Sequence, residues 1–271
     1  MKALFFENKL PKILALKAAS LFSKNAALGP FSPTRYAEVE TPELPNERWL
    51  KIKNHCCGLC GSDIHFIFMD LDPKCFPAAI PGVSRKYLGH EVVGEVVQVG
   101  DDVSDYNKGD RVALRIDWPS CHQLEIDPPC PQCQSGNYML CETPSKKQTA
   151  LLDTGGGFSP YMVLHRTQPF TIPEAVSEAR AVLLEPAASA VHTVQKAVPA
   201  AGNRVLIIGA GTIGLMTTAM VRSLSPETEI HSLYRYEFQA EAARKLGADE
   251  VISGGSEVFA DIGRRTGAGY F

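Results

Sequence analysis

Residues 205–214 read VLIIGAGTIG, an apolar run that leads directly into three closely spaced glycines. An apolar run bounded by glycine is typical of a buried parallel strand, and the apolar positions that follow predict a helix. In such a strand–turn–helix unit the first glycine makes the tight turn, the second lets the backbone approach a pyrophosphate, and the third lets helix and strand pack closely. We therefore expect a dinucleotide site that comprises Gly209, Gly211, Thr212, Ile213 and Gly214.

The sequence around this stretch alternates between strand and helix patterns. Pro186 suits the first position of a helix that we expect to reach about Val198. After it, strands are predicted over 204–208, 229–234 and 250–252, with helices over 213–224 and 237–246. Strands that alternate with helices are typical of a parallel sheet, so we predict an α/β, doubly wound Rossmann domain over residues 186–271.

The end of the second expected strand indicates which dinucleotide binds. NAD-binding domains usually carry Asp or Glu there, which hydrogen-bonds the ribose 2′-hydroxyl. Residues 232–236 instead read SLYRY. We therefore favour NADP, with Arg235 pairing with the 2′-phosphate and Tyr234 or Tyr236 packing on the adenine. The alternatives are that Arg235 is a solvated residue at a strand end, or that NAD binds with its ribose held by another group.

The first half of the chain has β-rich patterns. We expect strands over 49–56, 91–99, 111–116 and 161–165, several of which alternate apolar and polar residues. Residues 117–147 hold four cysteines, five prolines and few periodic apolar positions, which indicates a loop that needs a cross-link. Within it, Cys130, Cys133 and Cys141 have a spacing suited to a closed zinc site.

Composition limits the class of protein. Hydrophobic residues make up 45% of the 271, charged residues 21%, and the net charge is −3, so the overall charge predicts neither a nucleic-acid partner nor an anionic membrane. Residues 10–22 are apolar but interrupted by lysines, and we interpret them as an amphipathic helix and not as a signal peptide. Residues 1–28 contain no arginine, unlike a mitochondrial presequence, so we expect a cytoplasmic protein. In the reducing cytoplasm, clustered cysteines favour metal ligation over disulfides.

A second set of residues offers ligands for a catalytic metal. Cys60, His90, Glu91 and Glu185 are the mixture of side chains that zinc accepts, and three protein ligands leave one position open for chemistry. Each also has a purely structural interpretation: Cys60 as a small buried side chain, His90 as a core histidine, and Glu185 as an acid at a helix N-terminus beside Pro186.

The motifs follow one another in an order that resembles the zinc-dependent medium-chain alcohol dehydrogenases. They are CGSDIH at 60–65, GHEVVGEVVQVG at 89–100, GDRV at 109–112, the cysteine-rich loop, EP at 185–186, GAGTIG at 209–214 and ARKLGAD at 243–249. The resemblance implies a β-rich GroES-like catalytic domain over residues 1–185, followed by the Rossmann domain over 186–271.

The resemblance also implies roles for the ligand candidates. Cys60 and His90 match zinc ligands, Glu91 matches a neighbouring acid that can join or leave the coordination sphere, and Glu185 matches the third protein ligand. Glutamate at this last position is usual in the sorbitol, threonine and glucose dehydrogenase branch, which favours polyol, sugar or other hydroxylated substrates.

Three residues near Cys60 match further functional positions of the family. Ser62 resembles the hydroxyl that hydrogen-bonds the substrate oxygen, His65 the end of a proton relay, and Asp63 an acid that positions a ligand. Ser62 and Asp63 would also suit a helix cap, and both roles are compatible.

The fourth ligand of the structural zinc remains open between two residues. The family's usual position matches Asp127, whereas Cys121 lies further upstream at the start of a longer loop. We prefer Cys121 because a thiolate makes the more typical closed site. Cys56, Cys57 and Cys75 lack such spacing, and we interpret them as core or free thiols.

We therefore expect a zinc-dependent, NADP-preferring oxidoreductase that interconverts a secondary alcohol, polyol or sugar with its carbonyl form. The alternatives are an NAD-dependent relative, or a non-catalytic zinc-stabilised fragment that serves binding or assembly. Residues 215–271 supply only part of a six-stranded sheet. We therefore expect a C-terminally incomplete Rossmann domain, and assign both the chemistry and a homo-oligomer to a full-length protein.

Overall fold

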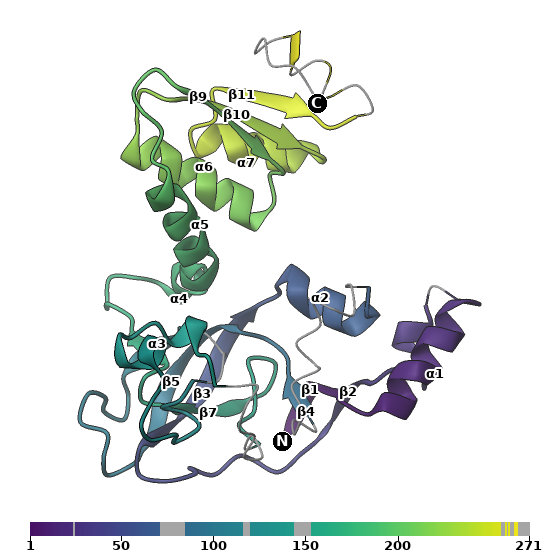
Figure 1. The fold of residues 1–271 in the computed structure, drawn as a ribbon, viewed down its shortest axis with the longest axis vertical. Helices are drawn as coiled ribbons and strands as arrows, with labels where there is room; N and C mark the ends of the chain where they lie inside the picture. Colours follow the sequence, from purple (N-terminus) through teal and green to yellow (C-terminus); the bar gives the residue numbers. More distant parts are fainter. Residues whose placement is uncertain are drawn as a thin grey trace. The chain divides into compact units, whose positions relative to one another are not determined.

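The computed structural model describes residues 1–23, 25–70, 85–115, 120–143, 153–255, 258, 260, 263 and 264. The chain divides into two compact units, Met1–Leu183 and Leu184–Phe271, and Figure 1 shows the elements of each. The boundary expected after Glu185 falls inside helix α5 (Leu184–Lys196). Cys75, expected as a core or free thiol, and Ile116, the expected end of a strand, lie outside the described residues.

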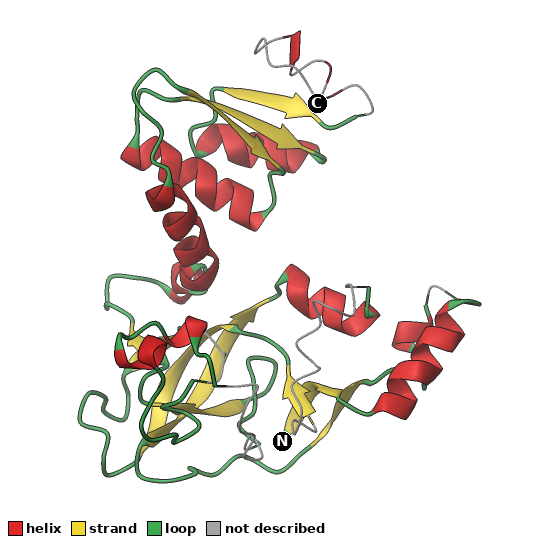
Figure 2. Cartoon of the chain, in the orientation of Figure 1, coloured by secondary structure: helices red, strands yellow, loops and turns green. Residues whose placement is uncertain are grey.

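The first unit contains two antiparallel sheets. The larger has the strand order β7-β3-β5-β6-β8, with bounds β7 (Tyr161–His165), β3 (Trp49–Gly58), β5 (Glu91–Val99), β6 (Arg111–Leu114) and β8 (Pro169–Thr171). The smaller has the order β2-β1-β4, with bounds β2 (Thr34–Glu38), β1 (Lys2–Glu7) and β4 (Arg85–Tyr87). Figure 2 shows how strands and long loops dominate this unit, which confirms its predicted β-rich character.

Alternation along the central strands creates the core of the larger sheet. Leu50 and Ile52 on β3 are fully buried, as are Val96 on β5 and Val112 on β6. Side chains two apart on a strand point to the same face, so these residues form one apolar layer. The layer packs β3 against β5, and the residues that follow β3 and those where β5 begins carry the ligand candidates.

Short helical segments complete the described part of the first unit. They are α1 (Leu10–Ser20), η1 (Ala26–Leu28), α2 (Gly61–Phe68), α3 (Pro131–Gln134), η4 (Tyr138–Leu140) and α4 (Glu178–Ala181). The helix expected near the N-terminus is therefore present. In the described residues, no helix is long and apolar enough to cross a membrane.

The second unit is a parallel sheet with helices packed against it. The strand order is β11-β10-β9, with bounds β11 (Glu250–Ser253), β10 (Glu229–Tyr234) and β9 (Arg204–Ile208). Helices α6 (Thr212–Leu224) and α7 (Glu237–Lys245) connect successive strands, as the alternating pattern predicted. The core contains Val194, Ile207, Val221 and Ile230, so one apolar cluster joins α5, α6 and the sheet.

Candidate functional site

The first candidate centre brings together Cys60, His90 and Glu91. Potential ligand atoms of these three residues all lie within 4.8 Å of one another. Cys60 follows β3 and stands directly before α2, while His90 and Glu91 stand where β5 begins. Because β3 and β5 pair antiparallel with Gly58 opposite Glu91, residues thirty positions apart in sequence become neighbours.

Gly58 makes room for the carboxylate of Glu91. A Cβ atom built on Gly58 would lie 1.9 Å from Glu91 Oε2, which no real contact tolerates. Glu91 is 9% exposed, so its carboxylate lies in this space and not in bulk water. A side chain at the position facing Glu91 across the strand pair would therefore displace this carboxylate.

Asp63 ties the two ligand-bearing segments together. Its carboxylate is buried, and Oδ2 accepts a hydrogen bond from the backbone N–H of Cys60 at 3.1 Å. The other oxygen, Oδ1, accepts from the backbone N–H of Gly89 at 3.0 Å and lies 3.9 Å from His90 Nδ1. One side chain thus fixes the backbone beside both Cys60 and His90, which is how outer residues orient metal ligands.

The two residues expected to handle protons lie on the same short helix. Ser62 is half-buried in the first turn of α2. His65 is exposed one turn later, with Nδ1 2.5 Å from Asp70 Oδ1.

Glu185 belongs to the second unit. It is half-buried in the first turn of α5, directly before the buried Pro186. Its expected role as a metal ligand stays a prediction.

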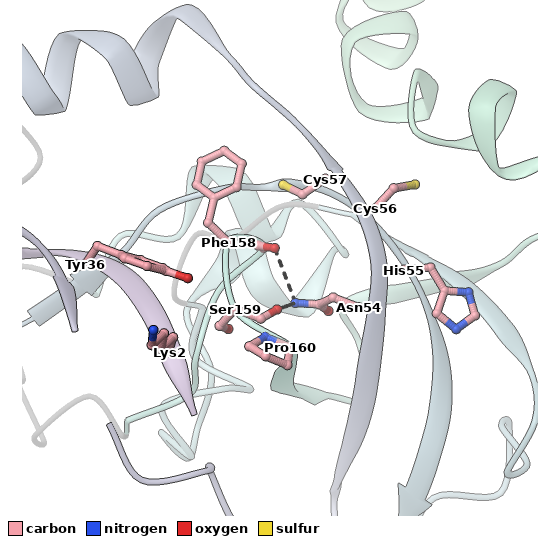
Figure 3. Close-up of a pocket in the computed structure, with 10 residues that line it drawn as sticks. Lys2, Tyr36, Asn54, His55, Cys56, Cys57, Phe158, Ser159 and Pro160 are labelled. Atoms are coloured by element: carbon pink, nitrogen blue, oxygen red, sulfur yellow. Dashed lines mark hydrogen bonds between the residues drawn. The ribbon is translucent and has the colours of Figure 1, made fainter. Parts of the chain in front are cut away.

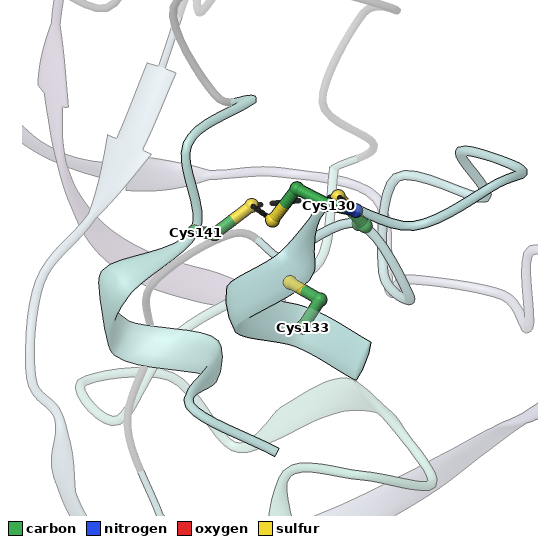
Figure 4. Close-up of side chains that lie close together, drawn as sticks. Cys130, Cys133 and Cys141 are labelled. Carbon is green, nitrogen blue, oxygen red and sulfur yellow. Dashed lines mark hydrogen bonds between the residues drawn. The ribbon is translucent and has the colours of Figure 1, made fainter. Parts of the chain in front are cut away.

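The second candidate centre is a cluster of four thiols. Potential ligand atoms of Cys121, Cys130, Cys133 and Cys141 all lie within 4.8 Å of one another, and Figure 4 shows three of these side chains. The Sγ atoms of Cys121 and Cys141 are 3.6 Å apart, and those of Cys130 and Cys141 are 3.9 Å apart. A tetrahedral Zn–S₄ site with bonds of about 2.3 Å has S···S edges of about 3.8 Å. The thiols therefore fit zinc.

Disulfides are absent from this cluster: each of its four cysteines is a free thiol. The backbone N–H groups of Glu142 and Cys133 stabilise the thiolate of Cys130 and lower its pKa to about 6. Burial raises the pKa of Cys133. Zinc binds thiolates, so these N–H groups favour the form of Cys130 that can ligate the metal.

The structure distinguishes between the two candidates for the fourth ligand. Cys121 is fully buried and its Sγ accepts a hydrogen bond from the backbone N–H of Cys130 at 3.3 Å. Among the described residues, the group of converging ligand atoms includes Cys121 and does not include Asp127.

The glycine-rich turn of the second unit has the local form of a phosphate-binding loop. It runs from β9 to α6, and Gly211 is the residue that precedes the first turn of the helix. A Cβ atom on Gly214 would lie 1.8 Å from the carbonyl oxygen of Gly209, so the third glycine is needed where helix and turn meet. Backbone N–H groups at such a helix N-terminus are free to bind an anion.

Arg235 follows β10 directly and is exposed. Its guanidinium lies over the ring of Tyr236, 5.4 Å from the ring centroid, and Tyr236 stacks on Phe238 at 5.8 Å with nearly parallel planes. Tyr236 is about half exposed, whereas Tyr234 is half-buried at the end of the strand. The accessible aromatic surface beside Arg235 is therefore that of Tyr236 and Phe238.

Gln239, which was not predicted from the sequence, holds the backbone of Arg235 and Tyr236 between β10 and α7. Its Oε1 accepts hydrogen bonds from the backbone N–H groups of both Arg235 and Tyr236, each at 3.1 Å. These bonds satisfy amides at the start of α7. A glutamine three residues after a helix start was the available signal.

A pocket of about 330 Å³ borders β3 in the first unit, and its lining includes Asn54, Cys57, Phe158 and Ser159 (Figure 3). Asn54 Nδ2 donates to the carbonyl oxygens of Gly156 at 2.9 Å and Ser159 at 2.6 Å. Asn54 therefore fixes the 156–160 segment against β3. Burial raises the pKa of Cys57 to about 12, so its thiol stays neutral.

Comparison with known proteins matches residues 46–174 to the alcohol dehydrogenase GroES-like domain. The chain is 30% identical over 218 residues to sorbitol dehydrogenase from Halalkalibacterium halodurans, a match that covers 80% of this chain and 58% of that relative. The chain thus spans less than two thirds of that relative's length.

Solved structures are similar over both units. The 2R,3R-butanediol dehydrogenase from Bacillus subtilis has 27% identity and a TM-score of 0.70, over 99% of this chain and 68% of that chain. A dehydrogenase from Sinorhizobium meliloti 1021 bound to NADP has 29% identity and a TM-score of 0.62, over 81% of this chain and 58% of that chain.

These similarities confirm the predicted architecture, a GroES-like domain followed by part of a Rossmann domain. The chain belongs to the medium-chain alcohol dehydrogenase family.

Proposed function

We propose that this protein acts as a zinc-dependent oxidoreductase that transfers a hydride between a secondary alcohol, polyol or sugar and NADP(H). The observation that carries the proposal is the convergence of Cys60, His90 and Glu91 within 4.8 Å, with Asp63 bonded to the backbone beside Cys60 and His90. The bond to Cys60 also caps α2, whereas the bond to Gly89 connects the helix with the segment that carries His90.

The donor set suits a catalytic zinc. Cys60 supplies a thiol and His90 an imidazole, and either Glu91 or Glu185 supplies the carboxylate. With three protein ligands bound at one time, the site leaves a position for substrate. When bound, zinc supplies Lewis acidity that lowers the pKa of a coordinated hydroxyl group.

The residues of α2 provide the route for the proton. Ser62, in the first turn, is a hydroxyl that both accepts and donates hydrogen bonds, so it suits contact with a substrate oxygen. His65 is exposed and paired with Asp70, so it suits exchange of a proton with solvent. We propose that the substrate proton leaves through Ser62 towards His65.

The preference for NADP is supported by Arg235. It occupies the position directly after β10 where NAD-binding domains usually carry a carboxylate, and its backbone is fixed by Gln239. A guanidinium beside an exposed aromatic pair suits a phosphate and an adjoining base. Similar solved structures hold either cofactor, NADP in the S. meliloti dehydrogenase and NADH in an alcohol dehydrogenase from E. coli CFT073, so the preference for NADP rests on Arg235.

The substrate class is supported by the names of the relatives. Sorbitol and 2,3-butanediol share neighbouring hydroxyl groups, so we propose a substrate in which a second hydroxyl lies beside the reacting one.

The deciding experiment combines metal analysis, cofactor titration and a substrate panel. Sorbitol, 2,3-butanediol and 2-propanol are each tested with NAD and NADP, and turnover is followed by the absorbance of the reduced nicotinamide. We expect turnover of the two diol-containing substrates with NADP, and loss of turnover in Cys60→Ser. A folded, zinc-free protein would refute the metal assignment, and zinc binding without cofactor binding would favour a non-catalytic role.

A further inference from the structure

The connection between β1 and β2 is longer than their pairing requires. The two strands are antiparallel neighbours, with Phe6 opposite Thr34, yet residues 8–33 separate them. Antiparallel neighbours are usually joined by about two to five residues. The additional residues form α1 and η1, and we call residues 8–33 the basic excursion.

One side of α1 anchors the basic excursion to the first unit. Leu16 is almost fully buried, and Ile13 packs against the cluster of Phe6, Phe66 and Leu88. These contacts fix how the helix is rotated, so its other sides face away from that cluster. The exposed residues of α1 are therefore held in a defined orientation.

The exposed side of the helix is apolar. Leu10, Leu14 and Leu21 are 66%, 57% and 82% exposed, and Phe22 is 90% exposed. At about 100° per residue, positions 10, 14 and 21 lie within about 40° of one another on the helix. The three leucines therefore share one face, and Phe22 extends from its end.

Charge is distributed unevenly along the chain. Residues 8–33 contain four lysines and no acidic residue, although the whole chain has a net charge of −3. Lys17 is exposed and lies on the same face as the leucines, between Leu14 and Leu21. Lys9 and Lys12 pair with Glu7, so Lys17 is the free cation among the described lysines of α1. The exposed face is thus both apolar and basic.

We propose that the basic excursion docks this protein on an anionic lipid surface. A short helix that presents exposed leucines and a phenylalanine around the ammonium group of Lys17 has the composition of an element that lies in the headgroup region, where that ammonium group reaches the phosphates. A second copy bound through the same face would oppose lysine to lysine. An anionic bilayer instead satisfies the apolar and the charged groups together. The proposal does not depend on the enzymatic activity.

The test is flotation of the 271-residue protein with lipid vesicles. One set contains phosphatidylcholine alone, and the other contains about 30% phosphatidylserine, each at about 0.1 M and about 0.5 M NaCl. The charge variant is Lys17→Glu, and its control is Lys108→Glu, at an exposed lysine on a turn of the same unit. The apolar variant is the double substitution Leu21→Ser/Phe22→Ser, and its control is Leu224→Ser, at an exposed leucine on α6. Thermal unfolding establishes that each variant is folded.

We expect binding to the anionic vesicles that falls at high salt and is weakened roughly tenfold or more by Lys17→Glu and by Leu21→Ser/Phe22→Ser, with both controls unchanged. Absence of binding to the anionic vesicles overturns the proposal. So does equal binding to phosphatidylcholine, or binding that the excursion variants leave intact. Flotation without vesicle binding, together with a dimer in light scattering that the double variant Leu21→Ser/Phe22→Ser dissociates, would mean that this face binds a second copy of the chain instead.

Discussion

The buried carboxylate of Asp63 accepts a hydrogen bond from the backbone N–H of Gly89 at 3.0 Å, across twenty-six residues of sequence. The same carboxylate accepts from the N–H of Cys60, so one side chain connects the end of β3 with the beginning of β5. The relative position of Cys60 and His90 therefore depends on Asp63 as much as on the sheet.

Replacing Asp63 with asparagine should weaken the first metal centre. The asparagine amide has one acceptor oxygen, so its NH₂ group would face the backbone N–H of either Cys60 or Gly89. A buried N–H group left without an acceptor costs about 1–3 kcal/mol. We expect zinc affinity at this centre to fall about 10- to 100-fold. Zinc content after dialysis against a weak chelator measures this, with the exposed Asp105→Asn as the matched control. Unchanged zinc retention would contradict the connecting role.

The thiol cluster should hold its own zinc. We expect about two zinc ions per chain in the intact protein, and about one in Cys130→Ser, together with a lower melting temperature. Cys56→Ser changes a thiol outside the cluster and should change neither quantity. Metal analysis and calorimetry check both, and a Cys130→Ser protein that retains both ions would show that the cluster is not a metal site.

The two later glycines of the turn should respond differently to alanine. Gly214→Ala places a Cβ against the carbonyl oxygen of Gly209, and we expect a loss of about 1–3 kcal/mol in the free energy of unfolding. Gly211→Ala meets nothing within 4 Å, so stability should be preserved while the added methyl group hinders the pyrophosphate. Urea unfolding and cofactor titration separate the two effects. Equal stabilities of the two variants would refute this account of the turn.

Arg235 should contribute to NADPH affinity and little to NADH affinity. A charged hydrogen bond to the 2′-phosphate is worth about 1.5–3 kcal/mol, so Arg235→Ala should weaken NADPH binding roughly 10- to 100-fold. Arg244→Ala, on the exposed part of α7, serves as the control. Fluorescence titration measures the affinity for each cofactor. Equal losses of NADPH and NADH affinity in Arg235→Ala would exclude a specific 2′-phosphate contact.

His165 should make stability depend on pH in the mildly acidic range. Its ring is buried against Trp49, and burial together with nearby cationic groups lowers the pKa of His165 to about 4. An unfolded histidine has a pKa of about 6.5, so the unfolded chain binds the proton first as the pH falls. The contribution of the neutral ring is complete above about pH 6.5 and declines towards pH 4.

We expect that decline to reach about 2 kcal/mol between about pH 7 and pH 5. Urea unfolding at both pH values measures it. His165→Gln should lower stability at pH 7 and flatten the pH dependence, whereas the exposed His192→Gln should leave the slope unchanged. A slope that survives His165→Gln would assign the effect to other groups.

Local sequence patterns predicted most of the elements. The strand over 204–208, the following helix and the strand over 229–234 appear as β9, α6 and β10, with bounds that agree within one residue. Apolar periodicity and glycine placement act within a few residues of one another, so they are visible before the chain folds.

Long-range geometry was beyond such patterns. Whether Cys121 or Asp127 approaches the other three thiols depends on the path of the loop between them, and only the folded structure shows Cys121 in the group. The space that Gly58 leaves for a carboxylate was equally hidden, because that carboxylate belongs to Glu91 on a neighbouring strand.

The sequence by itself thus determined the ligand types, the glycine-rich turn and the alternation of strand and helix, because these are properties of neighbouring residues. Only the tertiary structure decided that Asp63 joins two ligand-bearing segments, and that the leucines of α1 face away from the core that Leu16 enters. Both depend on strand pairing and packing between distant segments, and those contacts exist only once the chain has folded.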